Sequence, residues 1–224
     1  MQEFEMIKEG GHLLLSDMKN LWVLDTGSPN SFGELDAIKI CGNIHSVSKS
    51  YMGLDAKKLS DSLQFEVAGL IGGDILSDYD THWDCMGGII RFSHEEIIPA
   101  GDYIDLDFFM GIPTVSVKLL NETQTWFFDT GANICYVTEQ PDDWVDPVGE
   151  YEDFYPGYGK FQTEIFQAEI CIKNFLRVVS CGVLPELLGL SLSLGGCNGI
   201  LGMSELLETD LYYSPRNRKL LING

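Results

Sequence analysis

The chain repeats one sequence plan, and this repeat limits its possible fold more than any other feature. The segment that begins at His12 reads as a strand, a polar turn and a second apolar strand, Leu-Trp-Val-Leu, followed by Asp25-Thr-Gly-Ser. The segment that begins at Ser116 has the same pattern, with Thr-Trp-Phe-Phe followed by Asp129-Thr-Gly-Ala. A pattern that recurs in this order indicates two copies of one structural unit.

A second pair of motifs follows in the same order. Gly69-Leu-Ile-Gly72 in the first copy matches Gly199-Ile-Leu-Gly202 in the second. Each is followed by a polar stretch and a closing apolar strand, over Gly88–Phe92 and Lys219–Ile222 respectively. The repeat therefore covers the whole chain. It predicts two lobes, residues 1–104 and 105–224.

The remaining pattern favours an all-β fold with a few short helices. Short apolar or alternating runs are separated by Gly, Asn, Asp and Pro, which is typical of strands and turns. The segments Leu70–Ser77 and Gly202–Leu207 are the best helical candidates.

The two aspartates are placed as if to meet. Asp25 and Asp129 each follow a purely apolar run, and a charge at the end of a buried strand is costly unless it is paired or neutralised. Two neighbouring carboxyl groups share one proton, so that one can act as a general base on water while the other acts as an acid. We expect each threonine to hydrogen-bond across to the other copy, and each glycine to let the backbone pass close to the carboxylates.

In these motifs the chain resembles the pepsin-like and retropepsin-like aspartic peptidases. The resemblance rests on the two Asp-Thr-Gly triplets and on Leu70-Ile-Gly72 and Ile200-Leu-Gly202. It implies a bilobal acid-protease β-barrel fold with an internal pseudo-two-fold axis, made of two retropepsin-sized lobes fused in one monomeric chain. It also implies an aspartic endopeptidase that cleaves an extended peptide or protein and needs no cofactor or metal ion. The residues it assigns are the catalytic Asp25 and Asp129, supported by Thr26, Gly27, Ser28, Thr130, Gly131 and Ala132.

The two copies differ beside their aspartates. Ser28 offers a hydroxyl to Asp25, whereas Ala132 offers none to Asp129. Because hydrogen bonds to a carboxylate lower its pKa, we expect Asp25 to be the ionised member and Asp129 to hold the proton.

A flap over the substrate is expected from the second copy alone. The second copy has 26 more residues between its two motifs, and the segment Phe154–Phe161 has aromatic residues and a Gly-rich tip. The predicted flap residues are Tyr155, Gly157, Tyr158 and Gly159, followed by an alternating strand over Thr163–Ile172. The segment Phe32–Leu63 offers no such tip. An ordinary hairpin with surface aromatics remains open, as does a peptide-binding or regulatory module that cleaves poorly or not at all.

Composition limits the partners and the location. A formal net charge of −20 argues against nucleic acid as a partner. No apolar run is long enough to span a membrane, and the first 20 residues lack the pattern of a secretory signal. The six cysteines indicate thiols in a reducing compartment, with one bridge in the second half left open. These features favour a cytoplasmic over a secreted protein, although a removed leader is left open. The four histidines lack zinc-ligand spacing.

Three further features have structural interpretations. Trp22 and Trp126 are expected in the core, and Asp74 as the cap of a short helix. The acidic residues of the second copy are expected in a solvated loop. They are Asp142, Asp143, Asp146, Glu150, Glu152 and Asp153.

Overall fold

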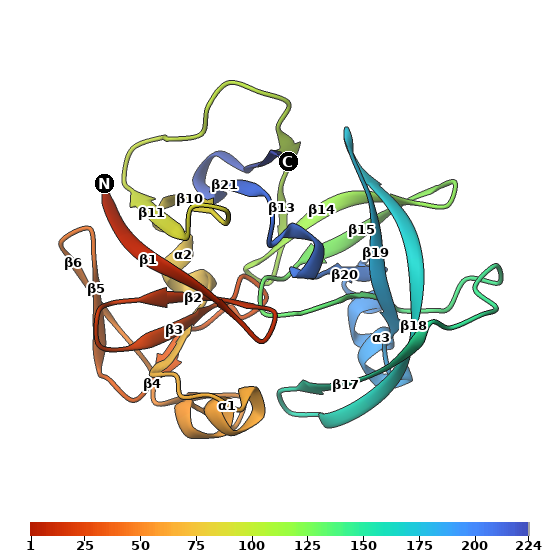
Figure 1. Ribbon diagram of the computed structural model, residues 1–224, viewed down its shortest axis with the longest axis horizontal. Helices are drawn as coiled ribbons and strands as arrows, with labels where there is room; N and C mark the ends of the chain where they lie inside the picture. Colours follow the sequence, from red (N-terminus) through yellow and green to blue (C-terminus); the bar gives the residue numbers. More distant parts are fainter. Residues whose placement is uncertain (224) are drawn as a thin grey trace.

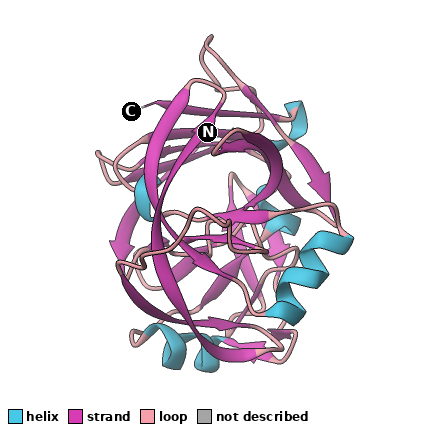
Figure 2. Cartoon of the chain, turned by 90° about the vertical axis from the view of Figure 1, so that its right-hand side faces the viewer, coloured by secondary structure: helices cyan, strands magenta, loops and turns pink. Residues whose placement is uncertain are grey.

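A computed structural model describes residues 1–223, without the side chain of Glu205. Strands contain 50 % of the residues and helices 12 %, so the chain is mostly β, as predicted. Figure 2 shows the strands forming the body of the molecule and the short helices lying at its periphery.

The larger of two main sheets has ten strands in the order β12-β22-β21-β10-β11-β1-β2-β3-β9-β4. Its strands are β1 (Gln2–Glu9), β2 (His12–Ser16), β3 (Leu21–Leu24), β4 (Phe32–Gly33), β9 (Gly69–Ile71), β10 (Asp80–Asp84), β11 (Ile89–Ser93), β12 (Ile104–Asp105), β21 (Asp210–Ser214) and β22 (Lys219–Asn223). The predicted boundary between residues 104 and 105 falls within β12. The last two strands of the chain return to this first sheet, so both halves of the sequence build it (Figure 1).

The second main sheet has eight strands in the order β13-β14-β15-β20-β16-β19-β18-β17. Its strands are β13 (Asp107–Phe109), β14 (Ile112–Leu119), β15 (Glu122–Phe128), β16 (Cys135–Val137), β17 (Gly149–Tyr155), β18 (Gly159–Ile172), β19 (Phe175–Val183) and β20 (Gly199–Leu201). The predicted alternating strand over Thr163–Ile172 is confirmed as part of β18, and buried and less buried positions alternate along most of it.

Two small hairpins and five short helices complete the structure. The hairpins are β5 (Ala37–Ile40) with β6 (Asn43–Ser46), and β7 (Ser50–Tyr51) with β8 (Leu54–Asp55). The helices are α1 (Ala56–Leu63), α2 (Gly73–Leu76), α3 (Glu186–Leu194) and the 3₁₀ turns η1 (Ser204–Leu206) and η2 (Pro215–Asn217). The helices predicted over Leu70–Ser77 and Gly202–Leu207 are therefore shorter than expected, because the first residues of the former belong to β9.

The sequence repeat is visible in the pairing of the strands. In the first copy β3 pairs antiparallel with β2 and parallel with β9, which pairs antiparallel with β4. In the second copy β15 pairs in the same way with β14 and β20, and β20 with β16. The strands β3 and β15 end immediately before Asp25 and Asp129. The repeated pairing therefore places both aspartates at equivalent points of the two sheets.

One hydrophobic cluster joins the two copies. Trp22 and Trp126 are fully buried in it, as predicted. Trp83 from β10 stacks on Phe128 from β15, with 6.4 Å between the ring centroids. The ends of the two aspartate-bearing strands are thus anchored in a common core.

Candidate active site

Each aspartate stands where its strand leaves the sheet, held by the strand that passes behind it. The backbone N–H of Asp25 donates to the carbonyl of Ile71 at 3.0 Å, and that of Asp129 donates to the carbonyl of Leu201 at 3.1 Å. The two apolar-apolar-Gly motifs of the sequence therefore support the two aspartate loops in the same manner.

Glycine is required directly after each supporting strand. A Cβ atom on Gly72 would stand 2.6 Å from the carbonyl oxygen of Ser28, and one on Gly202 would stand 2.2 Å from that of Ile134. Any side chain at either position would push the aspartate loop away, because real Cβ contacts are never this short.

Thr26 and Thr130 bind the two loops to each other. The backbone N–H of Thr26 donates to Thr130 Oγ1 at 3.0 Å, and the N–H of Thr130 donates to Thr26 Oγ1 at 3.1 Å. The hydroxyl of Thr26 donates to the carbonyl of Phe128 at 2.6 Å, and that of Thr130 to the carbonyl of Leu24 at 2.9 Å. Both side chains are fully buried. The expected cross-copy hydrogen bonds are confirmed, and they are reciprocal.

The glycines of the two triplets let the carboxyl groups approach. A Cβ atom on Gly27 would stand 2.2 Å from Cγ of Asp129, and one on Gly131 would stand 2.5 Å from Cγ of Asp25. Each carboxyl group therefore lies over the glycine of the opposite loop, and the two carboxyl groups are close enough to interact directly. A backbone N–H group donates to one oxygen of each carboxyl group, from Ser28 to Asp25 Oδ1 and from Gly131 to Asp129 Oδ1, each at 2.9 Å.

The environment makes this pair retain a proton. Burial raises the pKa of Asp25 well above its usual value, and repulsion from Asp129 raises it further. Burial also raises the pKa of Asp129, against the backbone hydrogen bonds from Gly131 and Ala132. A pair of carboxyl groups that cannot both ionise is suited to general acid–base chemistry.

The predicted role of the Ser28 hydroxyl was wrong. Ser28 Oγ donates to the carbonyl of Asn30 at 2.9 Å, and only the backbone N–H of Ser28 contacts Asp25. The hydroxyl therefore gives no reason for Asp25 to be the ionised member. Burial raises the pKa of both carboxyl groups, so the proton belongs to the pair as a whole.

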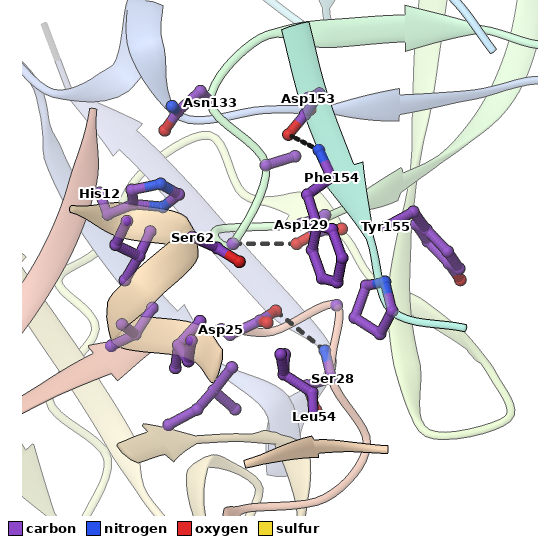
Figure 3. A pocket seen from close by; sticks show the side chains of 18 of the residues that line it. His12, Asp25, Ser28, Leu54, Ser62, Asp129, Asn133, Asp153, Phe154 and Tyr155 are labelled. Atoms are coloured by element: carbon purple, nitrogen blue, oxygen red, sulfur yellow. Dashed lines mark hydrogen bonds between the residues drawn. The ribbon is translucent and has the colours of Figure 1, made fainter. Parts of the chain in front are cut away.

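A cleft of about 470 Å³ opens over the carboxyl pair. Figure 3 shows Asp25 and Asp129 facing each other at its floor, with Phe154 and Tyr155 of β17 nearby. Of the predicted supporting residues, Gly27, Ser28, Gly131 and Ala132 line the cleft, while Thr26 and Thr130 lie beneath it.

The segment predicted as a flap forms the hairpin of β17 and β18, paired in register from Gly149↔Ile165 to Tyr155↔Gly159. Tyr155 lines the cleft, but Gly157, Tyr158 and Gly159 do not. Tyr158 instead packs edge-on against Phe161, with 6.1 Å between the ring centroids. Phe154 packs on the hydrophobic cluster of the first copy, so the hairpin reaches across the cleft (Figure 1).

The first copy also contributes to the wall of the cleft, which was not expected. The turn of the β7–β8 hairpin places Tyr51, Met52 and Leu54 along it. The methyl group of Met52 lies 3.4 Å from the position of a Cβ atom on Gly157, so the tips of the two hairpins meet. The turn was overlooked because its strands have only two residues each. Met52 and Gly53 supply its left-handed conformation, with φ angles of 49° and 79°.

Polar side chains at one end of the cleft were not predicted from the sequence as residues of the site. They are His12, Asn133, Tyr136, Tyr151 and Asp153. One signal was available for Asn133, which follows Asp129 at the same spacing as Pro29 follows Asp25 and so departs from the repeat.

Asp153 also corrects the prediction of a solvated acidic loop. The other five acidic residues of that set are exposed, whereas Asp153 is partly buried in the cleft. It belongs to β17, where side chains alternate between two faces, and its own face is covered by Tyr136.

Asp74 is not the cap of helix α2, since Gly72 occupies that position. The carboxylate of Asp74 instead accepts hydrogen bonds from the N–H and hydroxyl of Ser31, at 2.9 and 2.5 Å, and from the N–H of Ile75 at 3.0 Å. These bonds tie the helix to the aspartate loop.

The six cysteines form no disulfide within the described residues. Residues 1–223 contain no group of three or more His, Cys, Asp or Glu side chains arranged to hold a metal ion. No helix in the described part of the chain is long and apolar enough to cross a membrane.

Neither a scan against protein-family models nor a search of curated proteins returned a match. The function must be argued from the site.

Proposed function

We propose that the chain is an aspartic endopeptidase in which two small lobes, related by a pseudo-two-fold axis, form one active site. The observation that carries this proposal is the pair of adjacent, interacting carboxyl groups, Asp25 and Asp129, at equivalent points of a duplicated structure. The reciprocal threonine bonds and the cleft above the pair support it. Both aspartates come from one chain, so no second subunit is needed to complete the site.

The proposed reaction uses a water molecule held between the two carboxyl groups. The ionised carboxylate takes a proton from the water, which attacks the carbonyl carbon of the peptide bond. The protonated carboxyl group donates its proton to the carbonyl oxygen. The carboxyl group that took the proton from water passes it to the nitrogen of the tetrahedral intermediate, and the other carboxylate takes a proton from one of the hydroxyl groups of the intermediate. The C–N bond then breaks to release a carboxylic acid and an amine, and the pair again holds one proton. General acid–base catalysis of this kind contributes roughly 10²- to 10⁴-fold to a rate.

The β17–β18 hairpin gives a reason to propose an extended peptide as the substrate. The hairpin crosses the cleft and meets the β7–β8 turn, so a bound chain would lie beneath both. Closure over a substrate excludes water from the reaction. A module that binds peptides without cleaving them would use the same cleft, so activity must decide between the two functions.

The test is cleavage of a peptide library by the wild type and by Asp25→Asn and Asp129→Asn, between pH 3 and pH 7. We expect the wild type to cleave, and each variant to lose at least about 10²-fold in rate. Asp146→Asn, an exposed loop residue, is the matched control and should cleave like the wild type. Tight peptide binding without cleavage at any pH would instead identify a binding module.

A further inference from the structure

The two ends of the cleft are built from equivalent segments, yet they differ in polarity. The turn between β1 and β2 is followed by His12, and the turn between β13 and β14 is followed by Ile112. Beside these turns, Asn133 and Pro29 occupy equivalent positions after the two aspartates. One end of the cleft is therefore polar and the other apolar, although the repeat alone would make them alike.

Two hydrogen bonds within the second copy and one to the first copy hold the polar end in place. Asn133 Nδ2 donates to the carbonyl of Gly10 at 3.0 Å and to the hydroxyl of Tyr151 at 2.8 Å. The hydroxyl of Tyr136 donates to Asp153 Oδ2. Figure 3 shows Asn133 and Asp153 on the same side of the carboxyl pair, opposite Leu54. This end of the cleft is thus formed by ordered side chains.

Hydrogen-bonding capacity at this end is not fully used. Asn133 Oδ1 and His12 Nδ1 are buried and have no partner among the described residues. Buried polar atoms in folded proteins are nearly always paired, and an unpaired one calls for a ligand or an ordered water molecule. The polar end therefore has capacity for hydrogen bonds with a bound group.

This end holds the carboxyl group of Asp153, whose pKa is raised by burial against hydrogen bonds from Tyr136 and from the backbone N–H of Phe154, so it is negative at a pH above that raised pKa. Asp153 stands close enough to Asp129 to raise the pKa of that carboxyl group. Burial lowers the pKa of His12 to about 4, so its ring is neutral above that pH. The described residues that line the cleft include one lysine, Lys160, whose Nζ is held by Glu152 at 2.7 Å. Lys160 is therefore already paired, and no other lysine or arginine among the described residues lines the cleft.

The walls beside Asp153 are aromatic. Tyr136 and Phe161 lie with 6.0 Å between their ring centroids, and Tyr151 lines the same part of the cleft. Aromatic walls with a carboxylate and free hydrogen-bond acceptors suit a long aliphatic stem with a charged, donor-rich end. A net charge of −20 also attracts basic substrates from a distance.

We propose that the polar end of the cleft is a specificity pocket for a lysine or arginine side chain of the substrate, whose charged group binds Asp153 and Asn133 while its stem lies on Tyr136, Tyr151 and Phe161. This inference rests on the proposed peptidase function and adds the substrate class to it.

The test compares peptides that differ in one charge. A peptide series carries lysine or norleucine, or arginine or citrulline, at each position around the cleaved bond. We expect the wild type to show at least about a tenfold higher kcat/KM for the charged member at one position, since contacts to a buried charge are strong. Asp153→Asn should remove this ratio while cleavage of the norleucine peptide continues. Asp146→Asn should keep the ratio.

A binding measurement separates the two proposals. Asp25→Asn is combined with each charged and neutral peptide, labelled with fluorescein, and the dissociation constant is measured by anisotropy. We expect lysine or arginine peptides to bind at least about tenfold more tightly, and the double variant with Asp153→Asn to lose the difference. Equal binding of charged and neutral peptides overturns the pocket, whether or not the wild type cleaves. A charge preference in binding with no cleavage by the wild type overturns the peptidase and keeps the pocket. The comparison of charged with neutral peptides bound to Asp25→Asn tests the pocket even if variants with Asp153→Asn do not fold.

Discussion

Thr26 and Thr130 show at the residue scale how a duplicated sequence becomes one site. Each uses its hydroxyl oxygen to accept from the opposite threonine, and its hydroxyl proton to reach a carbonyl of the opposite strand. All four bonds are buried, so their partners have no access to water. Replacing either side chain by an apolar one leaves buried groups unpaired in the other copy.

We therefore predict that Thr26→Val lowers the free energy of unfolding by about 2–4 kcal/mol, because it leaves the N–H of Thr130 and the carbonyl of Phe128 unpaired. Urea unfolding followed by circular dichroism measures the loss. Thr26→Ser, which keeps the hydroxyl, should recover most of it. Thr125→Val, at an exposed position of β15, is the control and should change stability by less than about 0.5 kcal/mol. Equal effects at positions 26 and 125 would contradict the role of the cross-copy bonds.

The carboxyl pair leads to a second prediction, on how the stability of the fold depends on pH. Burial raises the pKa of Asp25 and Asp129 in the folded chain, whereas in the unfolded chain both titrate near about 3.9. The folded state therefore binds more protons, and stability falls as the pH rises above about 4 through the folded pKa values. Asp25→Asn removes one such carboxyl group and relieves the repulsion on the other.

We expect the stability of Asp25→Asn to decline less between pH 4 and pH 7 than that of the wild type, as measured by urea unfolding at several pH values. Asp146→Asn, which replaces an exposed carboxylate, should follow the wild-type curve. Parallel curves for Asp25→Asn and the wild type would show that burial of the pair does not perturb its ionisation.

At the scale of elements, the sequence predicted what the repeat could reveal. The strands that carry Asp25 and Asp129 and those that pass behind them were recognised because each appears twice. Helices α1 and α3 stand at equivalent places, just before β9 and β20, but their sequences do not repeat and both were missed, although Asp55 caps α1 by accepting from the N–H of Lys58. The β7–β8 hairpin was missed because its strands have only two residues each.

The candidate site also has one part that the sequence predicted and one part that it did not. The carboxyl pair and its threonines and glycines follow from local motifs. The polar end of the cleft does not, because His12, Asn133 and Asp153 come from three separate segments. They come together only because the Gly10–Gly11 turn approaches Asn133 and because β17 crosses the cleft. Tertiary contacts of this kind leave no periodic signal in one sequence.

At the scale of elements, a testable prediction concerns how the β17–β18 hairpin is held in place. Phe154 packs on the cluster of the first copy that contains Leu54 and Leu59, and this contact holds the hairpin across the cleft. Phe154→Ala should weaken the contact and raise the exchange rate of the backbone amides over residues 149–159 by roughly tenfold, for a half-buried ring worth about 1–2 kcal/mol. Hydrogen–deuterium exchange with mass spectrometry measures this exchange rate.

Val148→Ala serves as the control for this hairpin, since Val148 lies just before β17 and is 62 % exposed. Its exchange pattern should match the wild type. Unchanged exchange in Phe154→Ala would mean that the hairpin stays in place through its ladder with β18 alone.

At the scale of the whole molecule, the two copies are joined by a shared sheet. The closing hairpin of the first copy, β10 and β11, pairs through β10 with β21 of the second copy's closing hairpin. Together with the common hydrophobic cluster, this pairing leaves neither copy a complete unit of its own. We therefore expect one cooperative unfolding transition, in which tryptophan fluorescence and circular dichroism coincide.

An ion pair beside the pairing of β10 with β21 tests whether the two copies unfold together. Arg216, from η2, donates to Asp80 Oδ1 of β10 at 2.9 and 3.2 Å and to the carbonyl of His94 at 2.6 Å. Asp80 is 1 % exposed, so Arg216→Met would leave a buried carboxylate without a counter-charge and lower the free energy of unfolding by about 3–5 kcal/mol. Adding Asp80→Asn to that variant should recover part of the loss.

The control is Arg218→Met, two residues further on. Arg218 binds Asp107 at 3.1 Å, but both side chains are largely exposed, so its loss should cost less than about 1 kcal/mol. In Arg216→Met both probes should shift together to lower urea concentration, because the copies share the sheet that the ion pair stabilises. If fluorescence and circular dichroism separated into two transitions, or if both arginine variants had equal effects, the two copies would be independent folding units that are merely in contact.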